Sequence, residues 1–364
     1  MRIAIVGGGV VGLAVTYELA TAGREVDCYE AEKPMAGRSR GDTRVFRLAH
    51  DRAPLVDWAR QAHRGWQEWS LAAGIRLVGD QATVVSGDFA AIEASMAQAG
   101  APFAIVDAVP SLPAADVTGP FLVDVTGGVI QAAATGGFLT GKVCDRIVPE
   151  AVVGVHVHRN SAVVVTTTGR RSYDSVVLAA GAATAGLVAP LGIEVPTRLA
   201  HHARMTFRLR DAEQRPPCWL DRTQAWRPGF TSYGQLVAPG LWAVGGQLPD
   251  EDTAWDLGRD LATERARHAL TSYVSEYLTG CAPDVVDTVY CNVTVGLGDG
   301  LSCARVGPVF AVWGENLFKL APVIGRTLAE AAVELSSPSV LSAVAHGRPT
   351  RVTNRPGPVI GPSV

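Results

Sequence analysis

The sequence has few charged residues, and they do not cluster. Asp, Glu, Lys and Arg make up 18% of the 364 residues, the formal net charge is -3, and no block of like charge occurs. A nucleic-acid-binding face needs grouped basic residues, so we expect no nucleic-acid partner. Lysine is scarce, with only Lys33, Lys142 and Lys319 in the chain. Because Arg and Lys differ chemically, each of these lysines is a candidate for a specific role.

Long apolar runs and paired cysteines are also missing. No apolar run approaches the roughly 20 residues of a membrane-spanning helix, so we expect no membrane span. The six cysteines form no CxxC pair and no Cys/His spacing suited to zinc, so we expect neither a metal site nor a disulfide framework. This cysteine usage indicates a reducing, cytoplasmic location. The 48% apolar content and the length indicate two structural units.

The first 30 residues show a strand–helix–strand pattern with a glycine turn. The parts are a strand at 2–6, a G-x-G-x-x-G turn at Gly7, Gly9 and Gly12, a helix from 13 that ends at Gly23, and a strand at 24–29 followed by Glu30. Glycines let the backbone approach a pyrophosphate at a helix N-terminus, and the acid can accept hydrogen bonds from a ribose. The same spacing excludes a signal peptide. This pattern predicts dinucleotide binding but does not separate FAD from NAD.

The rest of the chain alternates between helical and strand-like segments. Apolar residues at helical spacing predict helices, and short apolar runs bounded by turn residues predict strands. The expected helices cover 56–73, 89–98, 133–142, 255–278 and 319–336, and the expected strands include 152–157, 162–165, 175–180, 286–295 and 308–313. Because strands typical of a nucleotide-binding domain occur at the start, middle and end, we expect two interleaved domains.

The segment GRSRGDTRVFR, residues 37–47, carries a family resemblance. It resembles the monomeric sarcosine oxidase branch of the FAD-dependent D-amino-acid/glycine oxidase superfamily, where a Gly-Asp-Thr-Arg segment follows the first acidic residue. By this resemblance, the residues that lie against FAD are Arg38, Ser39, Asp42, Thr43 and Arg44. Arg47 then binds the substrate carboxylate, for which a planar guanidinium is suited. The alternative is a pair of arginines in surface ion pairs.

The resemblance continues to about residue 349 and covers essentially the whole chain. The strand end VLAAGA, residues 177–182, is similar to a small-residue strand end beside the dinucleotide, which places Gly181 at the cofactor. Val152 matches a strand residue that contacts the adenine. The segment GENLFK is similar to a closing motif under the flavin, with Gly314 and Leu317 at the cofactor. Its Lys319 matches a lysine that helps to hold the substrate carboxylate.

The resemblance also gives the fold class and the domain boundaries. We expect an α/β fold, in which a Rossmann-like FAD-binding domain with a parallel sheet is interleaved with an antiparallel-sheet α+β substrate domain. The FAD-binding domain is expected to comprise 1–80, 128–195 and 286–347, the substrate domain 81–127 and 196–285, and a C-terminal tail 348–364. The tail is rich in Pro and Gly. A monomer is expected by resemblance.

Three further positions bear on the chemistry. Cys291 matches a cysteine that carries FAD through a thioether in this branch, and a packing cysteine is the alternative. Tyr233 matches an active-site tyrosine. Trp242 is the best match to a lysine that activates dioxygen, and no lysine occurs between Lys142 and Lys319. A cation would stabilise developing superoxide, so another cation substitutes, reoxidation is slow, or the enzyme is a dehydrogenase.

The resemblance implies FAD-dependent oxidation of a C–N bond. A small amino acid, imino acid or secondary amine would lose a hydride to flavin N5 and become an imine, and O2 would reoxidise the flavin to give H2O2. The expected catalytic residues are Arg47, Lys319, Tyr233 and Trp242. Three alternatives stay open: a flavin dehydrogenase with another acceptor, a nicotinamide-dependent dehydrogenase, and a flavoprotein fold that only binds. His50, His201 and His202 are weaker pocket candidates.

Overall fold

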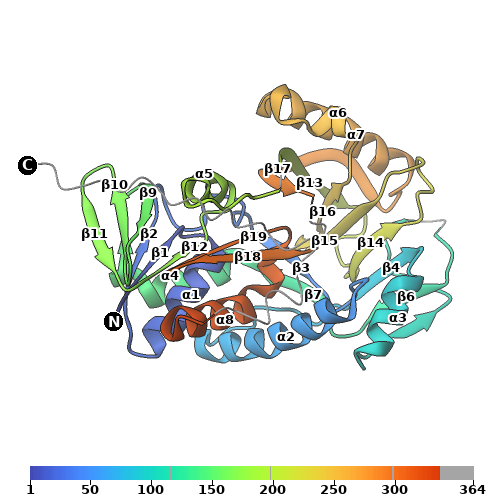
Figure 1. The fold of residues 1–364 in the computed structure, drawn as a ribbon. Coiled ribbons are helices and arrows are strands. Elements are labelled where there is room, and N and C mark those ends of the chain that lie inside the picture. The colour runs from blue at the N-terminus through green and yellow to red at the C-terminus, as the bar shows by residue number, and fades with distance from the viewer. Residues whose placement is uncertain (115–116, 197, 297–298, 337–364) are drawn as a thin grey trace, which may run out of the picture.

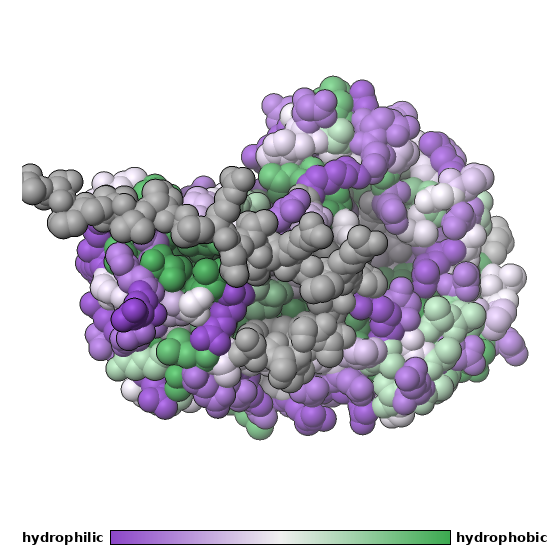
Figure 2. Space-filling model, viewed as in Figure 1, coloured by the Kyte–Doolittle hydropathy of each residue, from purple (hydrophilic) through white to green (hydrophobic). Residues whose placement is uncertain are grey.

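The computed structural model describes residues 1–114, 117–196, 198–296 and 299–336. The expected tail 348–364 and the end of the expected FAD-binding domain lie outside these residues. In the described part, two large β-sheets stand side by side, with helices along the outer faces (Figure 1). No helix in these ranges is both long and apolar enough to cross a membrane. Among the coloured residues of Figure 2, hydrophilic side chains cover most of the visible face, and hydrophobic ones form small separate patches.

The first large sheet has six strands that come from the start, middle and end of the chain. Its order is β18-β19-β12-β1-β2-β8, with bounds β18 Leu301–Val306, β19 Val309–Gly314, β12 Ser175–Leu178, β1 Arg2–Val6, β2 Glu25–Tyr29 and β8 Ile147–Val148. All neighbours are parallel except β18 and β19. Short, almost fully buried apolar strands are typical of a parallel sheet covered on both faces. This sheet confirms the expected α/β class with a βαβ opening.

Helices from distant segments cover one face of this sheet. They are α1 Val10–Thr21, α2 Ala53–Ala73, α4 Ala132–Val143 and α8 Ala321–Glu334. In α2, Trp58, Trp66 and Trp69 lie on the buried face, and Gly74 ends the helix in the left-handed conformation (φ 69°). α1 and α8 approach closely, because a Cβ on Gly325 would lie 2.7 Å from the Ala14 Cβ. The sheet and these helices bury the largest apolar core of the protein.

The second large sheet has eight strands and is mostly antiparallel. Its order is β17-β13-β16-β15-β14-β4-β6-β5, with bounds β17 Cys281–Val295, β13 Arg198–Leu209, β16 Leu241–Gly246, β15 Ser232–Ala238, β14 Cys218–Arg222, β4 Thr83–Gly87, β6 Phe121–Asp124 and β5 Ala104–Val106. α7 Arg259–Glu276 packs on one face of it, and α3 Ala90–Gln98 lies at the β4–β6 end (Figure 1). β17 pairs with β13 as far as Val295, so the expected border at 285/286 falls inside a strand.

Two small sheets and several short helices complete the fold. β9 Val152–Val157, β10 Ala162–Thr166 and β11 Arg170–Tyr173 form one sheet, and β3 Thr43–Phe46 pairs with β7 Gly128–Gln131. The short helices are η1 Cys144–Arg146, η2 Gly181–Ala183, α5 Thr184–Val188, η3 Ala189–Leu191, α6 Asp250–Thr253, η4 Trp255–Leu257 and η5 Leu317–Leu320. β3 contacts β15 of the eight-stranded sheet and also η5, the short helix that follows β19. The segments 37–47 and 314–319 therefore lie next to each other, and Arg38 donates to Asn316 across this contact.

Candidate active site

The glycine turn between β1 and α1 leaves no room for side chains. Gly7 has φ 108°, and a Cβ there would lie 2.5 Å from the Ala179 carbonyl oxygen. A Cβ on Gly12 would lie 1.8 Å from the Gly7 carbonyl oxygen. Helix α1 has no capping side chain at Gly9 and no acidic residue in its first turn, so its positive end can receive an anion. This backbone geometry fits a pyrophosphate.

Glu30 lies beside the same turn, at the end of β2. Its carboxylate accepts the Gly8 N–H at 2.6 Å and the Glu32 N–H at 3.0 Å. An ionised carboxylate has further lone pairs, so it can also accept the hydroxyls of a ribose. Ser39 reaches the turn from the other side, where its Oγ accepts the Val10 N–H at 3.0 Å. The structure thus brings Ser39 to the glycine turn, beside the expected ribose acid.

Arg44 holds the backbone of the loop that precedes β3. Its guanidinium donates to the carbonyl oxygens of Thr43 (2.7 Å), Arg38 (3.0 Å) and Arg40. Burial, together with the charge of Arg204, lowers the pKa of Arg44 to about 10, which leaves it protonated at neutral pH. Arg204, from β13, donates to the Thr43 carbonyl oxygen at 2.9 Å. These two arginines therefore fix the shape of the loop that is expected to face the cofactor.

Unpaired buried polar atoms surround this loop. Arg38 donates through Nη2 to Asn316 at 3.3 Å, but its Nη1 is buried and has no partner among the described residues. Gln235 donates to Thr43 Oγ1 at 3.4 Å, and its buried Oε1 is likewise unpaired within the described chain. Buried polar groups in proteins are almost always hydrogen-bonded, so these atoms fit a polar ligand at the loop. The Asp42 carbonyl oxygen accepts the first N–H groups of α4.

The two expected carboxylate-binding residues meet at one acidic side chain. Arg47 follows β3, Lys319 lies in η5, and both form ion pairs with Asp299. Lys319 Nζ lies 3.2 Å from Asp299 Oδ1, and Arg47 Nη2 contacts Oδ2. Asn316 also donates to Oδ1, at 2.7 Å. Arg47 and Lys319 thus form a pair of cations, which we call the carboxylate clamp.

The charges in the carboxylate clamp are strongly coupled. Burial raises the pKa of Asp299, but Arg47 and Lys319 outweigh it and hold that pKa well below its usual range. Burial lowers the pKa of Lys319 to about 8, and Asp299 opposes this shift. His50 Nδ1 lies 3.2 Å from Asp299 Oδ2, and burial plus the two cations lowers the pKa of His50 to about 3. At neutral pH, His50 is therefore an uncharged neighbour.

Asp124 supports the clamp from the end of β6. Its Oδ2 accepts the N–H groups of Leu48 and of Ala49 (3.1 Å), the two residues that follow Arg47. Burial raises the pKa of Asp124 to about 6 against the effect of these hydrogen bonds. Arg47 in turn donates to the Ala49 carbonyl oxygen. Asp124 thus fixes the backbone from which the Arg47 side chain extends.

One face of the eight-stranded sheet points toward the loop and carries three expected residues. His202 on β13 pairs in register with Cys291 on β17, so both side chains lie on the same face. His202 Nε2 is 2.9 Å from the Tyr233 hydroxyl. Burial and three neighbouring arginines lower the pKa of His202 to about 4, and burial raises the pKa of Tyr233. Cys291 is half-buried beside this neutral pair.

Trp242 lies on the opposite face of this sheet, which corrects the expectation that placed it above the flavin. It is fully buried in the apolar core with Phe207 and Leu270, under α7. A Cβ on Gly234 would lie 2.6 Å from its ring. Because side chains alternate along a strand, the neighbour that faces the loop is Ala243. The side chain of this strand on the face toward the loop is therefore the methyl group of Ala243.

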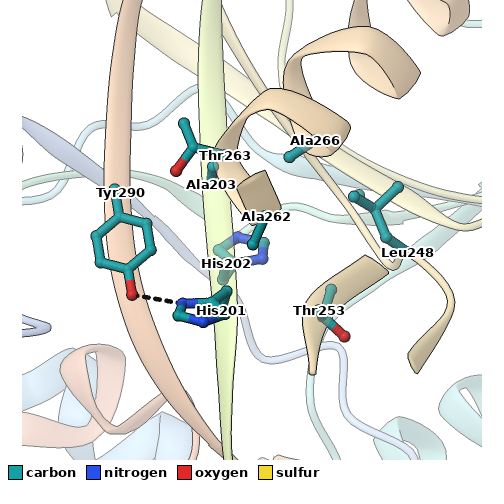
Figure 3. A pocket seen from close by; sticks show the side chains of 10 residues that line it. His201, His202, Ala203, Leu248, Thr253, Ala262, Thr263, Ala266 and Tyr290 are labelled. Carbon is teal, nitrogen blue, oxygen red and sulfur yellow. Dashed lines mark hydrogen bonds between the residues drawn. The ribbon is translucent and has the colours of Figure 1, made fainter. Parts of the chain in front are cut away.

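His201 also faces away from the loop. Its Nδ1 lies 2.7 Å from the Tyr290 hydroxyl and its Nε2 lies 3.1 Å from the Trp255 carbonyl oxygen. His201 and Tyr290 line a small pocket between β13, β17 and α7 (Figure 3). Neither Arg47 nor Lys319 is among the residues that line it. His201 is thus separated from the carboxylate clamp by the sheet.

The remaining expected cofactor residues lie at strand ends. Gly181 begins η2 after β12 with φ 57°, and Gly314 ends β19 where a Cβ would lie 2.6 Å from the Gly300 carbonyl oxygen. Leu317 opens η5, the element of Lys319. Val152 is half-buried in β9, in the separate three-stranded sheet. The described residues contain no group of three His, Cys, Asp or Glu side chains that could hold a metal ion.

Three residues of the site carried no expected role from the sequence. Asp124, Arg204 and Asp299 each act through partners far away in the chain. Arg204 lies in the strand HARMTF, where polar and apolar residues alternate, so its charge alone does not reveal a specific partner. Asp299 lies between Gly298 and Gly300, which is only a weak turn signal.

Comparison with known proteins shows the family to which the chain belongs. Residues 2–331 match the sequence profile of the family described as "FAD dependent oxidoreductase" (DAO). Comparison with curated proteins found no match.

Several solved structures share the fold. NikD, "an unusual amino acid oxidase essential for nikkomycin biosynthesis", is 21% identical with a TM-score of 0.80, over 93% of this chain and 96% of that one. L-proline dehydrogenase from P. horikoshii is 16% identical with a TM-score of 0.75, over 92% and 94% of the two chains. Glycine oxidase from Bacillus cereus is 14% identical with a TM-score of 0.72, over 95% and 99%. At these identities the likeness shows the fold alone.

Proposed function

The chain belongs to the FAD-dependent oxidoreductase family, and from this premise we propose that it oxidises the C–N bond of a small, carboxylate-bearing amine to an imine. The substrate class is an amino acid, an imino acid or a secondary amine with a carboxylate. The observation that carries the proposal is the meeting of Arg47 and Lys319 at a single carboxylate. Asp299 holds these two cations from distant segments side by side, and the donors that each cation keeps beyond its bond to Asp299 suit recognition of a substrate carboxylate.

The residues of the glycine turn and the loop fit FAD. Gly7, Gly9 and Gly12 would receive the pyrophosphate, Glu30 the ribose, and the unpaired Arg38 Nη1 a polar group of the cofactor. When bound, FAD supplies the two-electron acceptor for the oxidation. The protein supplies binding and orientation of the substrate amine. This division assigns the redox chemistry to the cofactor and the selectivity to the chain.

The two histidines at the described site are uncharged at neutral pH. Burial depresses the pKa of His50 to about 3 and of His202 to about 4, so both imidazoles are neutral there. Tyr233 is held protonated by burial, which raises its pKa, and it can donate a hydrogen bond. Imidazoles with such low pKa values are too weak as bases to take the proton of an ammonium group, so the substrate amine has to bind in its deprotonated form.

The proposed function has two forms, an oxidase and a dehydrogenase, which differ in the electron acceptor. An oxidase that passes electrons to O2 and releases H2O2 is favoured by the resemblance to amine oxidases. A dehydrogenase with another acceptor is favoured by Ala243, because the residue of β16 on the site face is an alanine and not the lysine that would activate O2. The L-proline dehydrogenase of similar fold supports the second version. We place the oxidase first.

Three further features complete the proposal. Cys291, half-buried on the site face, would carry FAD through a thioether. All six cysteines are free, which suits a reducing cytoplasm. The protein would act as a monomer.

Spectroscopy of the purified protein tests the proposal. We expect a yellow protein whose flavin absorbance bleaches under anaerobic conditions when an amino acid from a panel is added. Return of the absorbance on admitting air identifies an oxidase, and return only with an artificial acceptor identifies a dehydrogenase. Colour that stays with the acid-precipitated pellet supports the thioether, and Cys291→Ser should then release it. A flavin that no amine bleaches would overturn the proposed activity.

A further inference from the structure

The two cations of the carboxylate clamp repel each other. Arg47 and Lys319 both contact the same Asp299 carboxylate, so their positive charges lie within the span of one small group. Like charges at such a distance repel, and burial strengthens the repulsion because little water screens it. Lysine can relieve the repulsion by losing its proton, whereas arginine cannot. Lys319 is 5% exposed, so it is the member of the pair that would lose its proton.

Asp299 contacts both cations at once. Its Oδ1 accepts from Lys319 Nζ (3.2 Å), and its Oδ2 accepts from Arg47 Nη2. The carboxylate orientation is fixed by a third donor, since Asn316 Nδ2 donates to Oδ1 at 2.7 Å. Asn316 itself accepts from Arg38 at 3.3 Å, which ties the Asp299 carboxylate to the cofactor loop.

We propose that Asp299 is a positioning residue, whose carboxylate keeps Lys319 protonated and holds it next to Arg47 at the spacing that a substrate carboxylate requires. The purpose of this arrangement rests on the proposed function, whereas the electrostatic effect on Lys319 does not. Asp299 neutralises one of the two positive charges, so the clamp keeps a net charge that one substrate carboxylate can balance.

The groups around Lys319 support this role. The cations that act on it are Arg47 and Arg38, the neighbouring His50 is neutral, and Asp299 is the only anion among its strongest charged neighbours in the described chain. Burial already lowers the pKa of Lys319 to about 8, with Asp299 opposing. Without Asp299, burial and two arginines would all favour the neutral amine. Asn316 cannot replace Asp299, because it has no charge.

The scarcity of lysine permits a direct test. Lys33 and Lys142 are exposed, and Lys319 is the only buried lysine. Holoenzyme labelled with ¹³C at the lysine Cε should therefore give three resonances, of which Lys319→Arg removes one. We expect the Lys319 resonance of the wild-type protein to titrate at lower pH than the other two. In Asp299→Asn, the pKa of Lys319 should fall by at least about one further unit, which is a tenfold loss of proton affinity.

Controls separate this effect from a general loss of structure. Asp51→Asn removes an exposed carboxylate near the site and should leave the Lys319 titration unchanged. Asp299→Glu should restore part of the wild-type value. If Asp299→Asn does not fold, Asn316→Ala frees the Asp299 carboxylate without changing charge and should give a smaller shift in the same direction. A Lys319 titration that is unmoved or moves upward in the folded variant overturns the proposal.

Binding of acetate to the holoenzyme, followed by flavin absorbance, gives the second measurement. As the pH is raised, Asp299→Asn should lose its affinity for acetate at a lower pH than the wild-type protein does. The double variant Asp299→Asn/Lys319→Arg should lack this pH dependence, because arginine stays charged. Asp299→Asn that binds acetate as tightly as wild type at every pH overturns the positioning role. If instead no amine bleaches the flavin while Lys319 still responds to Asp299→Asn, the proposed activity fails and this inference stands.

Discussion

The proposed cofactor end and the proposed substrate end of the site are assembled in different ways. The cofactor end consists of consecutive backbone, Gly7 to Gly12, and its geometry depends on the absence of side chains. The substrate end consists of Arg47, Asp299 and Lys319, which come from three distant segments and touch only through their side chains. A backbone site can therefore be read from one stretch of sequence, whereas a side-chain site depends on the whole fold. Substitutions should separate the two ends.

The largest effect is expected at the glycine turn. In Gly12→Ala, the new Cβ would lie 1.8 Å from the Gly7 carbonyl oxygen, so the turn must move. Overpacking of this kind costs about 3 kcal/mol, and here it also disrupts the pyrophosphate position. We expect purified Gly12→Ala to contain little FAD by absorbance. Gly141→Ala in α4 is the matched control, because its Cβ would meet no atom within 4 Å outside its chain neighbours and its own helix backbone. Normal FAD content in both variants would contradict the account.

The next largest effect is expected at the carboxylate clamp. Arg47→Ala leaves Asp299 with one fewer cation and would remove the contact that we propose to the substrate carboxylate. Losing one member of such a pair costs about 3 kcal/mol, or roughly a hundredfold in kcat/KM for amino acids. FAD content should be unchanged, which distinguishes this variant from Gly12→Ala. The exposed Arg64→Ala serves as control, and an Arg47→Ala enzyme with unaltered KM would remove Arg47 from the clamp.

The clamp should also give the enzyme a pH limit. Lys319 must be protonated to hold a carboxylate, and burial lowers its pKa to about 8. Affinity for carboxylates should therefore be complete below that pH and weaken as the pH rises through it, by about tenfold per unit at most. In Lys319→Arg this limit should move to higher pH. The measurement is KM against pH, and a limb that stays in place in Lys319→Arg would assign it to another group.

A small effect is expected at Trp242, which belongs to neither end. Its ring packs in the core beneath α7, and its Nε1 has no partner among the described residues. Trp242→Phe loses some buried area without stranding a polar group, so we expect a stability loss of about 1–2 kcal/mol. Thermal unfolding measures that loss. Oxygen reactivity should change less than twofold, and a large change would return Trp242 to the active site.

The same contrast explains what the sequence could predict. The glycine turn, Glu30 and the helices α2, α3, α4, α7 and α8 follow from local spacing, and the structure contains them near the expected positions. Trp242 was misplaced because a shift of one residue in a strand moves a side chain to the other face. The expected border at 285/286 falls inside β17, because pairing with β13 keeps this strand continuous past Pro283 and Asp284. Tertiary pairing there outweighs local propensity.

The contacts between residues of the site could not be predicted from local sequence patterns. Arg47 and Lys319 were expected together only through family resemblance, and the Asp299 that joins them lies far from Arg47 in sequence. Asp124 supports the clamp through backbone N–H groups of Leu48 and Ala49, which leave no sequence pattern. Such contacts become visible only when the strand order of both sheets is known.

The most direct test of the account compares proline with pyrrolidine, its counterpart without a carboxylate. Both would be added to the wild-type holoenzyme under anaerobic conditions, and the rate of flavin bleaching would be followed, with other amino acid and amine pairs in parallel. If Arg47 and Lys319 clamp the substrate, the amino acid of a reactive pair should bleach the flavin at least a hundredfold more efficiently than its amine, in line with about 3 kcal/mol. Equal bleaching by both members of every reactive pair would contradict the carboxylate clamp.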